Sequence, residues 1–168
     1  RGLYNMTVSG RYLLLGKKEY VFLSVNDVSK EHELETSVKK NSEKFSSVFE
    51  NLPVGCAICD KNGTIIEVNS GYVDYLGLES KADSVGKLNI FDNPCINPEF
   101  KEMMHKGIPV SGEVKYDYEL LNRTYVRSSH RECFYYRFIV NYIKNPKDEI
   151  DYYVIIWVDN TLIHKTLR

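Results

Sequence analysis

The stretch FSSVFENLPVGCAICDKNGTIIEVNSGYVDYLGL, residues 45–78, carries the strongest fold signal in the sequence. Two mainly apolar runs, PVGCAICD (53–60) and TIIEVN (64–69), stand on either side of a short polar segment that ends at Gly63. Glycine supplies the positive φ that a short hairpin turn needs. The stretch therefore predicts two antiparallel strands joined by a tight turn.

Short helices and loops are predicted between this hairpin and the last third of the chain. Asn69 or Ser70 can cap a short helix, and Gly77 can end it. Pro98 stands at the typical first position of a further helix, which Gly107 would end. We therefore expect the middle of the chain to be helical and irregular.

Three long strands are predicted in the last third, over residues 112–120, 132–143 and 151–158. In the first strand apolar residues alternate strictly with charged ones, and the apolar set is Val114, Tyr116, Tyr118 and Leu120. This alternation indicates one buried and one solvated face. The other two strands carry apolar residues on both faces, so we expect a helix or a second subunit to cover the outer face of the sheet.

A further hairpin and a helix are predicted ahead of the central stretch. Residues 11–15 and 20–25 are two β runs joined by a tight turn at Gly16. A lone two-stranded hairpin is marginal in water, so we expect residues 11–25 to pack against another surface, such as a partner chain. Residues 30–51 then form a polar helix with a few regularly spaced apolar positions.

The apolar positions of this helix follow heptad spacing; they are Leu34, Val38, Phe45, Val48 and Leu52, with Asn41 at one position of the same seam. A polar seam residue can fix the register of paired helices. Two interpretations stay open: a dimeric coiled coil, or an amphipathic helix that lies on its own domain. The adjacent Val48 and Phe49 favour the second interpretation for the C-terminal half.

The composition excludes several classes of function. The chain has 168 residues, a net charge of −1 and no basic footprint, so we expect no contact with nucleic acid or a membrane surface. Its longest apolar run, residues 152–158, is far shorter than a membrane span. Four cysteines without a dense framework favour a reducing compartment. We therefore expect a cytoplasmic segment, although its parent protein could be membrane-anchored elsewhere.

Residues 43–161 resemble the PAS (Per-ARNT-Sim) domain. The likeness rests on the order of predicted elements and on single residues: Asn51-Leu52-Pro53 after the helix, then Gly55, Asp60, Gly63, Asn69 and Gly77, and an Asp-x-Thr ending at Asp159 and Thr161. Asn160 stands where the family has an apolar residue. The resemblance implies an α+β PAS fold, with a five-stranded antiparallel sheet, short helices on one face, an N-terminal amphipathic helix, and an additional β-hairpin in front.

The middle of the chain, with the run NIFDNP at residues 89–94, further resembles PAS modules of Bacteroides-type sensor histidine kinases. This resemblance implies that residues 1–29 are the C-terminal hairpin of a preceding PAS domain and that residues 30–52 form a connecting helix. Residues 43–161 would be a complete PAS domain, and residues 162–168 the start of an output helix. The kinase domains of the parent protein would be the downstream partners.

Two short segments, Asp27-Val28-Ser29 and Asp159-Asn160-Thr161, each stand where a strand becomes a helix. A hydroxyl at this place can accept a hydrogen bond from a free N–H of the first helical turn. One interpretation is an ordinary helix cap. The other, which the family resemblance favours for Asp159 and Thr161, is signal transfer from a strand to an output helix.

Candidates for chemistry are few. Cys56 and Cys59 have the spacing of a metal or redox pair, but residues three apart on a strand face opposite ways. His105, near a helix C-terminus where cations are favoured anyway, is a weak haem-ligand candidate, and His164 is predicted to be a surface residue. The sequence around Cys95 lacks the Asn-Cys-Arg run of flavin-binding light sensors. We therefore expect no catalytic residue, no metal and no resident cofactor.

Tyrosine is the residue in surplus, with 13 in the chain and many on the last three strands. Four inward-facing aromatic residues could line a cavity with hydroxyls for an unidentified small molecule; they are Tyr116, Tyr118, Phe138 and Tyr142. A plain filled core is the alternative, and such a PAS domain could still relay a signal.

Three functions are compatible with these observations. The preferred one is a signal-sensing and relay module of a cytoplasmic sensor histidine kinase in a two-component system, a segment that is not itself an enzyme. The second is a ligand-free dimerisation or spacer module, with a homodimer formed through the connecting helix and the outer sheet face. The third is a haem- or flavin-bearing sensor.

Overall fold

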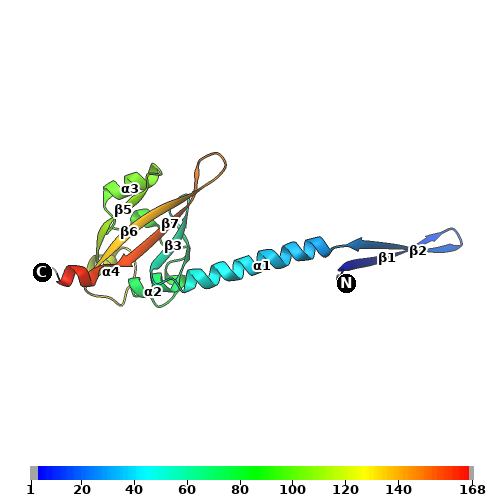
Figure 1. Ribbon diagram of the computed structural model, residues 1–168, viewed down its shortest axis with the longest axis horizontal. Coiled ribbons are helices and arrows are strands. Elements are labelled where there is room, and N and C mark those ends of the chain that lie inside the picture. The colour runs from blue at the N-terminus through cyan, green and yellow to red at the C-terminus, as the bar shows by residue number, and fades with distance from the viewer. Residues whose placement is uncertain (1–3, 167–168) are drawn as a thin grey trace. The chain divides into compact units, whose positions relative to one another are not determined.

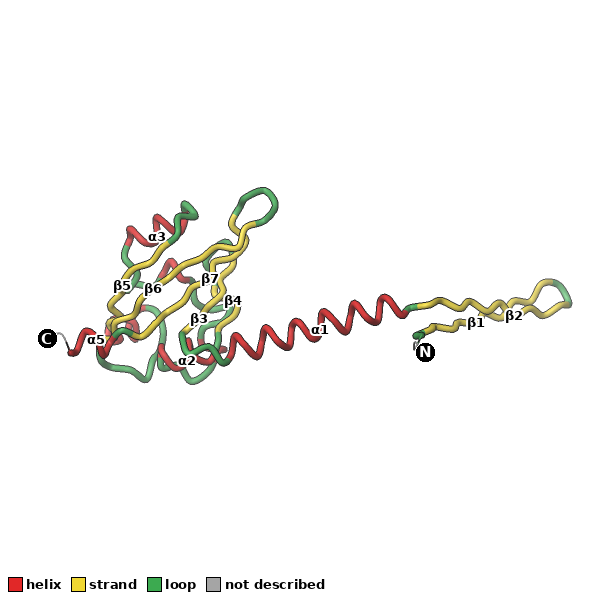
Figure 2. Tube along the Cα trace, in the orientation of Figure 1, coloured by secondary structure: helices red, strands yellow, loops and turns green. Residues whose placement is uncertain are grey.

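A computed structural model describes residues 4–166, except the side chains of Leu13 and Leu15. The chain forms two compact units that divide between Ser47 and Val48. The first unit holds a two-stranded antiparallel sheet and the second a five-stranded antiparallel sheet (Figure 1). Figure 2 shows where strands, helices and loops follow one another along the chain.

The first unit begins with the predicted hairpin, built from β1 (Met6–Leu15) and β2 (Lys18–Asp27). Leu15 pairs with Lys18, so Gly16 and Lys17 alone form the turn. Gly16 has a φ of +66°, the left-handed conformation that this kind of two-residue turn requires. The predicted hairpin is therefore confirmed, with strands longer than the two apolar runs suggested.

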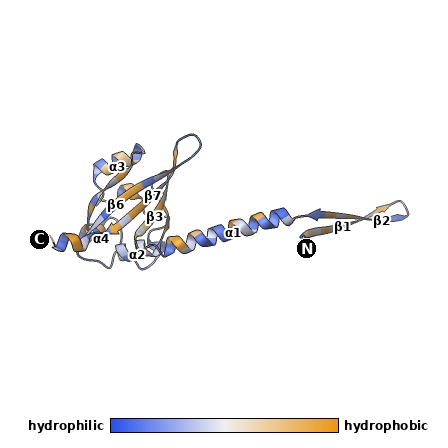
Figure 3. Cartoon of the chain, in the orientation of Figure 1, coloured by the Kyte–Doolittle hydropathy of each residue, from blue (hydrophilic) through white to orange (hydrophobic). Residues whose placement is uncertain are grey.

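Helix α1 (Ser29–Glu50) follows the hairpin, close to the bounds predicted for it. Its seam residues Leu34, Val38, Phe45 and Val48 are exposed by 51–68%. Figure 3 shows hydrophobic colour at intervals along α1 and on both strands of the hairpin. Phe49 is only 4% exposed, so it is the one of the two adjacent apolar residues that packs on the domain. No helix in the described part of the chain is long and apolar enough to cross a membrane.

The second unit is built on a five-stranded antiparallel sheet with the strand order β4-β3-β7-β6-β5, which confirms the predicted sheet. Its strands are β3 (Gly55–Asp60), β4 (Ile65–Val68), β5 (Val110–Asp117), β6 (Cys133–Lys144) and β7 (Ile150–Asp159). Gly63 stands in the β3–β4 turn with a φ of +85°, as the hairpin signal predicted. The chain's last hairpin, β6–β7, lies beside β3 on one side and β5 on the other.

Short helices provide the other half of the core. They are α2 (Ser70–Leu76), α3 (Pro98–His105), α4 (Tyr118–Thr124) and α5 (Thr161–Thr166), with 3-10 turns at Lys81–Asp83 (η1) and Ile90–Asp92 (η2). Buried side chains of α2, α3 and α4 join one core with the inward residues of β6 and β7, among them Met104, Leu121 and Trp157. The predicted arrangement of short helices on one face of the sheet is confirmed.

One predicted strand is wrong in its second half. The alternating run 112–120 was expected to be extended throughout, but β5 ends at Asp117 and α4 begins at Tyr118. The Asp117 carboxylate accepts hydrogen bonds from the backbone N–H groups of Glu119 and Leu120, at 3.0 and 3.1 Å, and so caps the helix. Leu120 consequently leaves the core and is 40% exposed, whereas Tyr118 stays fully buried.

The outer face of β6 and β7 carries a strip of half-buried apolar side chains, formed by Ile139, Val154, Ile156 and Val158. Tyr152, next to this strip, is 40% exposed. Apolar residues therefore do occupy both faces of these strands. That a helix or a second subunit covers the strip stays a prediction.

Candidate functional site

Three of the four predicted pocket residues lie inside an aromatic core. Tyr116, Tyr118 and Phe138 are 0% exposed, and Tyr142 is half-buried at the rim of the same cluster. The rings pack edge to face: the Tyr116 and Tyr118 centroids are 6.2 Å apart, and those of Phe138 and Trp157 are 5.6 Å apart. Edge-to-face packing of this kind stabilises a core. That a small molecule binds among these residues stays a prediction.

The buried hydroxyl of Tyr116 is a hydrogen-bond acceptor for two side chains. Trp157 Nε1 donates to it at 2.8 Å and Asn93 Nδ2 donates at 3.0 Å. Burial raises the pKa of Tyr116 well above its usual value, so this hydroxyl stays protonated. Tyr116 thereby joins β5, β7 and the loop after η2 through one buried oxygen.

Two further tyrosine hydroxyls, those of Tyr118 and Tyr136, form a pair in the same core. The hydroxyl groups of Tyr118 and Tyr136 both donate to the backbone oxygen of Tyr75, at 2.5 and 2.8 Å, and lie 3.1 Å from each other. Burial raises the pKa of both Tyr118 and Tyr136 above the usual range of a tyrosine. These groups can therefore orient hydrogen bonds but are not acids at neutral pH.

The exit from β7 into α5 is held by a small set of hydrogen bonds, which we call the C-terminal clamp, formed by Asp159, Asn160, Thr161 and Tyr135. The Asp159 carboxylate accepts from Thr161 N at 2.8 Å, and Asn160 N donates to Tyr135 O at 2.8 Å. The Thr161 hydroxyl accepts from Tyr135 N at 3.0 Å. Its partner is thus the backbone of β6, not a free N–H of the helix as expected from the sequence. Thr161 is 7% exposed, so the clamp ties β6, β7 and the first residue of α5 together.

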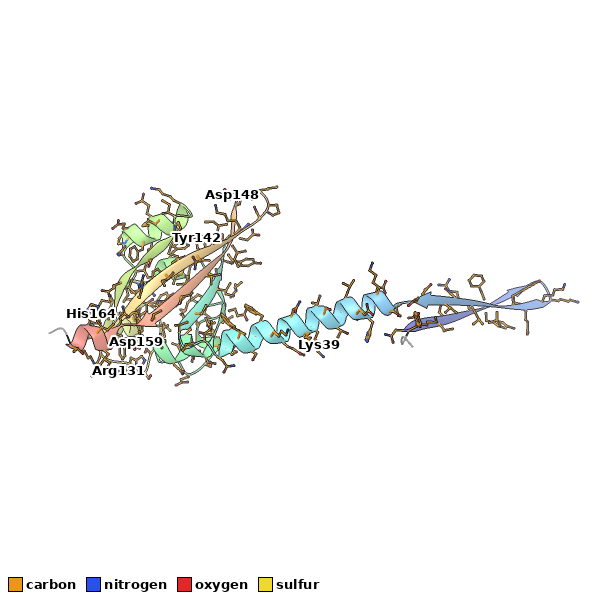
Figure 4. The ribbon with its side chains drawn as sticks, in the orientation of Figure 1. Lys39, Arg131, Tyr142, Asp148, Asp159 and His164 are labelled. Atoms are coloured by element: carbon orange, nitrogen blue, oxygen red, sulfur yellow. The ribbon has the colours of Figure 1, made fainter. Side chains whose placement is uncertain are left out.

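A second layer of contacts holds α5 to the sheet. His164 Nε2 lies 3.1 Å from Glu113 Oε2, and the His164 ring stacks on Tyr135 with centroids 4.3 Å apart. The hydrogen bond with His164, followed by one from Asn160, lowers the pKa of Glu113. Figure 4 labels Asp159 and His164 at this end of the domain. The sequence placed His164 on the surface and gave no sign of these partners, because they lie on other strands.

The N-terminal exit makes the same kind of contact. In this N-terminal clamp, formed by Asp27, Val28, Ser29 and Asn5, the Asp27 carboxylate accepts from Ser29 N at 2.9 Å. The Ser29 hydroxyl accepts from Asn5 N at 2.8 Å, and Val28 N donates to Asn5 O at 2.9 Å. The hydrogen bonds with Ser29 also lower the pKa of Asp27. Both pairs singled out in the sequence therefore join a helix start to the other side of a hairpin, at Tyr135 in β6 and at Asn5, directly ahead of β1.

Asn69 joins the end of α1 to the domain. Its Oδ1 accepts from Cys56 N at 2.8 Å and from Tyr72 N at 2.9 Å. Its Nδ2 donates to Phe49 O at 3.1 Å and to Val54 O at 2.9 Å. Asn69 is 0% exposed, and all four hydrogen bonds that its amide can make are made. The predicted helix cap is confirmed, and the other three bonds were not foreseen.

The residues considered for metal, redox or cofactor chemistry lie apart. Cys59 belongs to the core, whereas Cys56 is buried outside it, and burial raises their pKa values to about 12 and about 11. Both are therefore thiols at neutral pH. His105 is exposed, and its ring stacks on Phe91 with centroids 4.0 Å apart. Within residues 4–166 no group of three or more His, Cys, Asp or Glu could hold a metal ion. The haem and flavin alternatives stay predictions.

Comparison with known proteins gives one family match. Residues 43–109 match the family model described as PAS domain. The comparison with curated proteins found no match.

Several solved structures are similar to the chain. The PAS domain of an HTR-like protein from Haloarcula marismortui is 18% identical, with a TM-score of 0.57, over 76% of this chain and 98% of that one. A PAS domain from a two-component sensor histidine kinase is 12% identical, with a TM-score of 0.53, over 73% and 99%. The LOV protein of Rhodobacter sphaeroides is 14% identical, with a TM-score of 0.54, over 73% and 68%. Identities this low show the fold alone.

Proposed function

Residues 43–109 match the PAS family model and the fold is similar to that of solved PAS domains, and from this premise we propose that the chain senses a signal as a PAS module and relays it to the helix that follows β7. The signal would be a small molecule or a motion of α1, and the output a change in the position or stability of α5. The segment itself would catalyse no reaction.

The C-terminal clamp is the observation that carries this proposal. Tyr135 on β6 holds both Asn160 N and the Thr161 hydroxyl, at 2.8 and 3.0 Å. Strands β6 and β7, which the clamp ties together, also carry Phe138 and Trp157 into the aromatic core. A change in core packing that shifts β6 against β7 would therefore act directly on the first turn of α5. A ligand must favour one arrangement by about 5.5 kcal/mol to move a population from 1:99 to 99:1.

We place this module in a cytoplasmic sensor histidine kinase of a two-component system. Two observations support this parent: the resemblance of the middle of the sequence to such kinases, and the likeness of the fold to a PAS domain from a sensor histidine kinase. Phosphate transfer to an aspartate of a response regulator would belong to other domains of the parent.

Replacing Thr161 by valine tests the relay. Valine keeps the shape of the side chain but removes the oxygen that accepts from Tyr135 N. A buried donor that loses its acceptor lowers stability by about 1–3 kcal/mol, and we expect the loss of the Thr161 hydroxyl as acceptor for Tyr135 N to destabilise the attachment of α5 by about 1–2 kcal/mol. Hydrogen exchange of the α5 amides should become roughly 5- to 30-fold faster, and the full-length protein should lose its signal-dependent output while remaining folded.

Thr166→Val is the matched control. Thr166 lies in the same helix and donates within it, to Leu162 O at 2.8 Å, without touching the sheet backbone. This variant should leave exchange of the first turn of α5 and the output unchanged. Equal behaviour of the two variants, or a full output response from Thr161→Val, would contradict the relay.

A homodimer formed through α1 and the outer sheet face is the second part of the proposal. The exposed seam of α1 and the half-buried apolar strip on β6 and β7 support it. We expect a molar mass near twice 19.5 kDa by light scattering, and Val38→Lys should shift it toward the monomer. Glu35→Lys changes a neighbouring helix position outside the seam and should not. Identical masses for both variants would contradict pairing through the seam.

A further inference from the structure

The two clamps correspond bond for bond. In each clamp, the Asp carboxylate accepts a hydrogen bond from the backbone N–H two residues later. The Ser or Thr hydroxyl at that later position accepts a hydrogen bond from a backbone N–H on the other side of the hairpin. The residue that donates this N–H is Asn5 in one clamp and Tyr135 in the other, and each directly precedes the residue paired with the Asp. The backbone oxygen of the same residue accepts a hydrogen bond from the backbone N–H between the Asp and the hydroxyl residue, which is Val28 N for Asn5 and Asn160 N for Tyr135. The hairpin β1–β2 therefore enters α1 as β6–β7 enters α5.

Strand register extends this correspondence along both hairpins. From Met6–Asp27 to Leu13–Tyr20, the cross-strand pairs of β1–β2 match those of β6–β7: for example Met6–Asp27 with Tyr136–Asp159, Val8–Val25 with Phe138–Trp157, Gly10–Leu23 with Val140–Ile155, and Tyr12–Val21 with Tyr142–Tyr153. The match ends there, because the register of β6–β7 shifts between Ile143 and Lys144. Side chains alternate between faces along a strand. Matching positions therefore lie on matching faces of the two hairpins.

The matching faces have the same chemistry but opposite burial. In β6–β7 the inward face is packed, with Phe138, Val140, Ile155 and Trp157 exposed by 0–1%. In β1–β2 the corresponding face is mainly apolar, with Glu19 and Asp27 near its two ends. Its large apolar side chains are 58–66% exposed; they are Met6, Val8, Tyr12, Leu14, Val21, Leu23 and Val25. We call these seven residues the open face. The opposite face carries Thr7, Ser9, Arg11, Ser24 and Asn26, with Tyr20 and Phe22 as its aromatic members.

We infer that β1–β2 is the last hairpin of a second domain of this fold, and that the open face is its inner sheet face. The occupant is the part of the same polypeptide that lies ahead of β1. In the second unit every strand and helix that covers the matching face, from β3 to α4, comes before β6 in the chain. The edges of β1 and β2 would likewise pair with strands equivalent to β5 and β3. Helix α1 would then be the output helix of one domain and the input helix of the next.

Hydrogen exchange of residues 6–27 tests this inference, in the full-length polypeptide and in the 168-residue chain. We expect exchange at least roughly tenfold slower in the full-length polypeptide, because packing against a core protects strand amides. Val8→Lys and Leu23→Lys, made singly on the open face, should abolish this protection. Ser9→Lys and Ser24→Lys, their neighbours on the opposite face, should preserve it.

Three results would overturn the inference. One is equally fast exchange of residues 6–27 in both chains. Another is equal sensitivity to open-face and opposite-face variants. The third is full protection in the 168-residue chain that rises with protein concentration, because a second copy would then cover the open face.

Discussion

Asn69→Ala is expected to lower the free energy of unfolding of the second unit by about 4 kcal/mol. The substitution leaves the N–H groups of Cys56 and Tyr72 and the oxygens of Phe49 and Val54 without their side-chain partner. The site is fully buried, so water cannot replace the amide without rearrangement. Denaturant unfolding followed by fluorescence measures this, because the single tryptophan, Trp157, lies in this core.

Asn97→Ala is the matched control for this prediction. Asn97 also caps a helix, accepting from Phe100 N at 2.7 Å, but it is exposed and makes one such bond. Its loss should cost about 1 kcal/mol. If the two variants were equally destabilised, the four-bond role assigned to Asn69 would be wrong.

Local signals in the sequence predicted most of the fold. Gly63 and Gly16 marked two turns, and Asn69 and Pro98 marked helix starts, because each acts through backbone conformation or a bond a few residues away. Asp117 was the exception. The alternation of residues 112–120 suits a strand, yet an Asp cap overrides it and starts α4.

The candidate site was predictable only in part, since its contacts are long-range. Asp159 and Thr161 stood out by position, but the bond partner of Thr161 is Tyr135, 26 residues away on another strand. His164 and Glu113 are 51 residues apart, and nothing in their local sequence links them. Only the strand order and register bring these residues together.

Tyr116→Phe is expected to lower the free energy of unfolding by about 2–3 kcal/mol, although it removes a single oxygen. Trp157 Nε1 and Asn93 Nδ2 would both lose their acceptor inside the core. Trp157 fluorescence in a denaturant titration measures the change directly.

Tyr142→Phe separates this effect from the loss of a tyrosine hydroxyl in general. The Tyr142 hydroxyl donates to Ile108 O at the half-buried rim, so its removal should cost about 1 kcal/mol or less.

Alkaline pH gives a second test of the role of Tyr116. Burial raises the pKa of Tyr116 above 10.0 in the folded chain. The contribution of its protonated hydroxyl to the free energy of unfolding is therefore complete below pH 10.0, and it is lost at higher pH as Tyr116 ionises in the unfolded chain. Tyr116→Phe should therefore show a shallower loss of stability above pH 10.0 than the parent chain. An unchanged slope, together with a cost equal to that of Tyr142→Phe, would mean that Tyr116 fills space without organising the core.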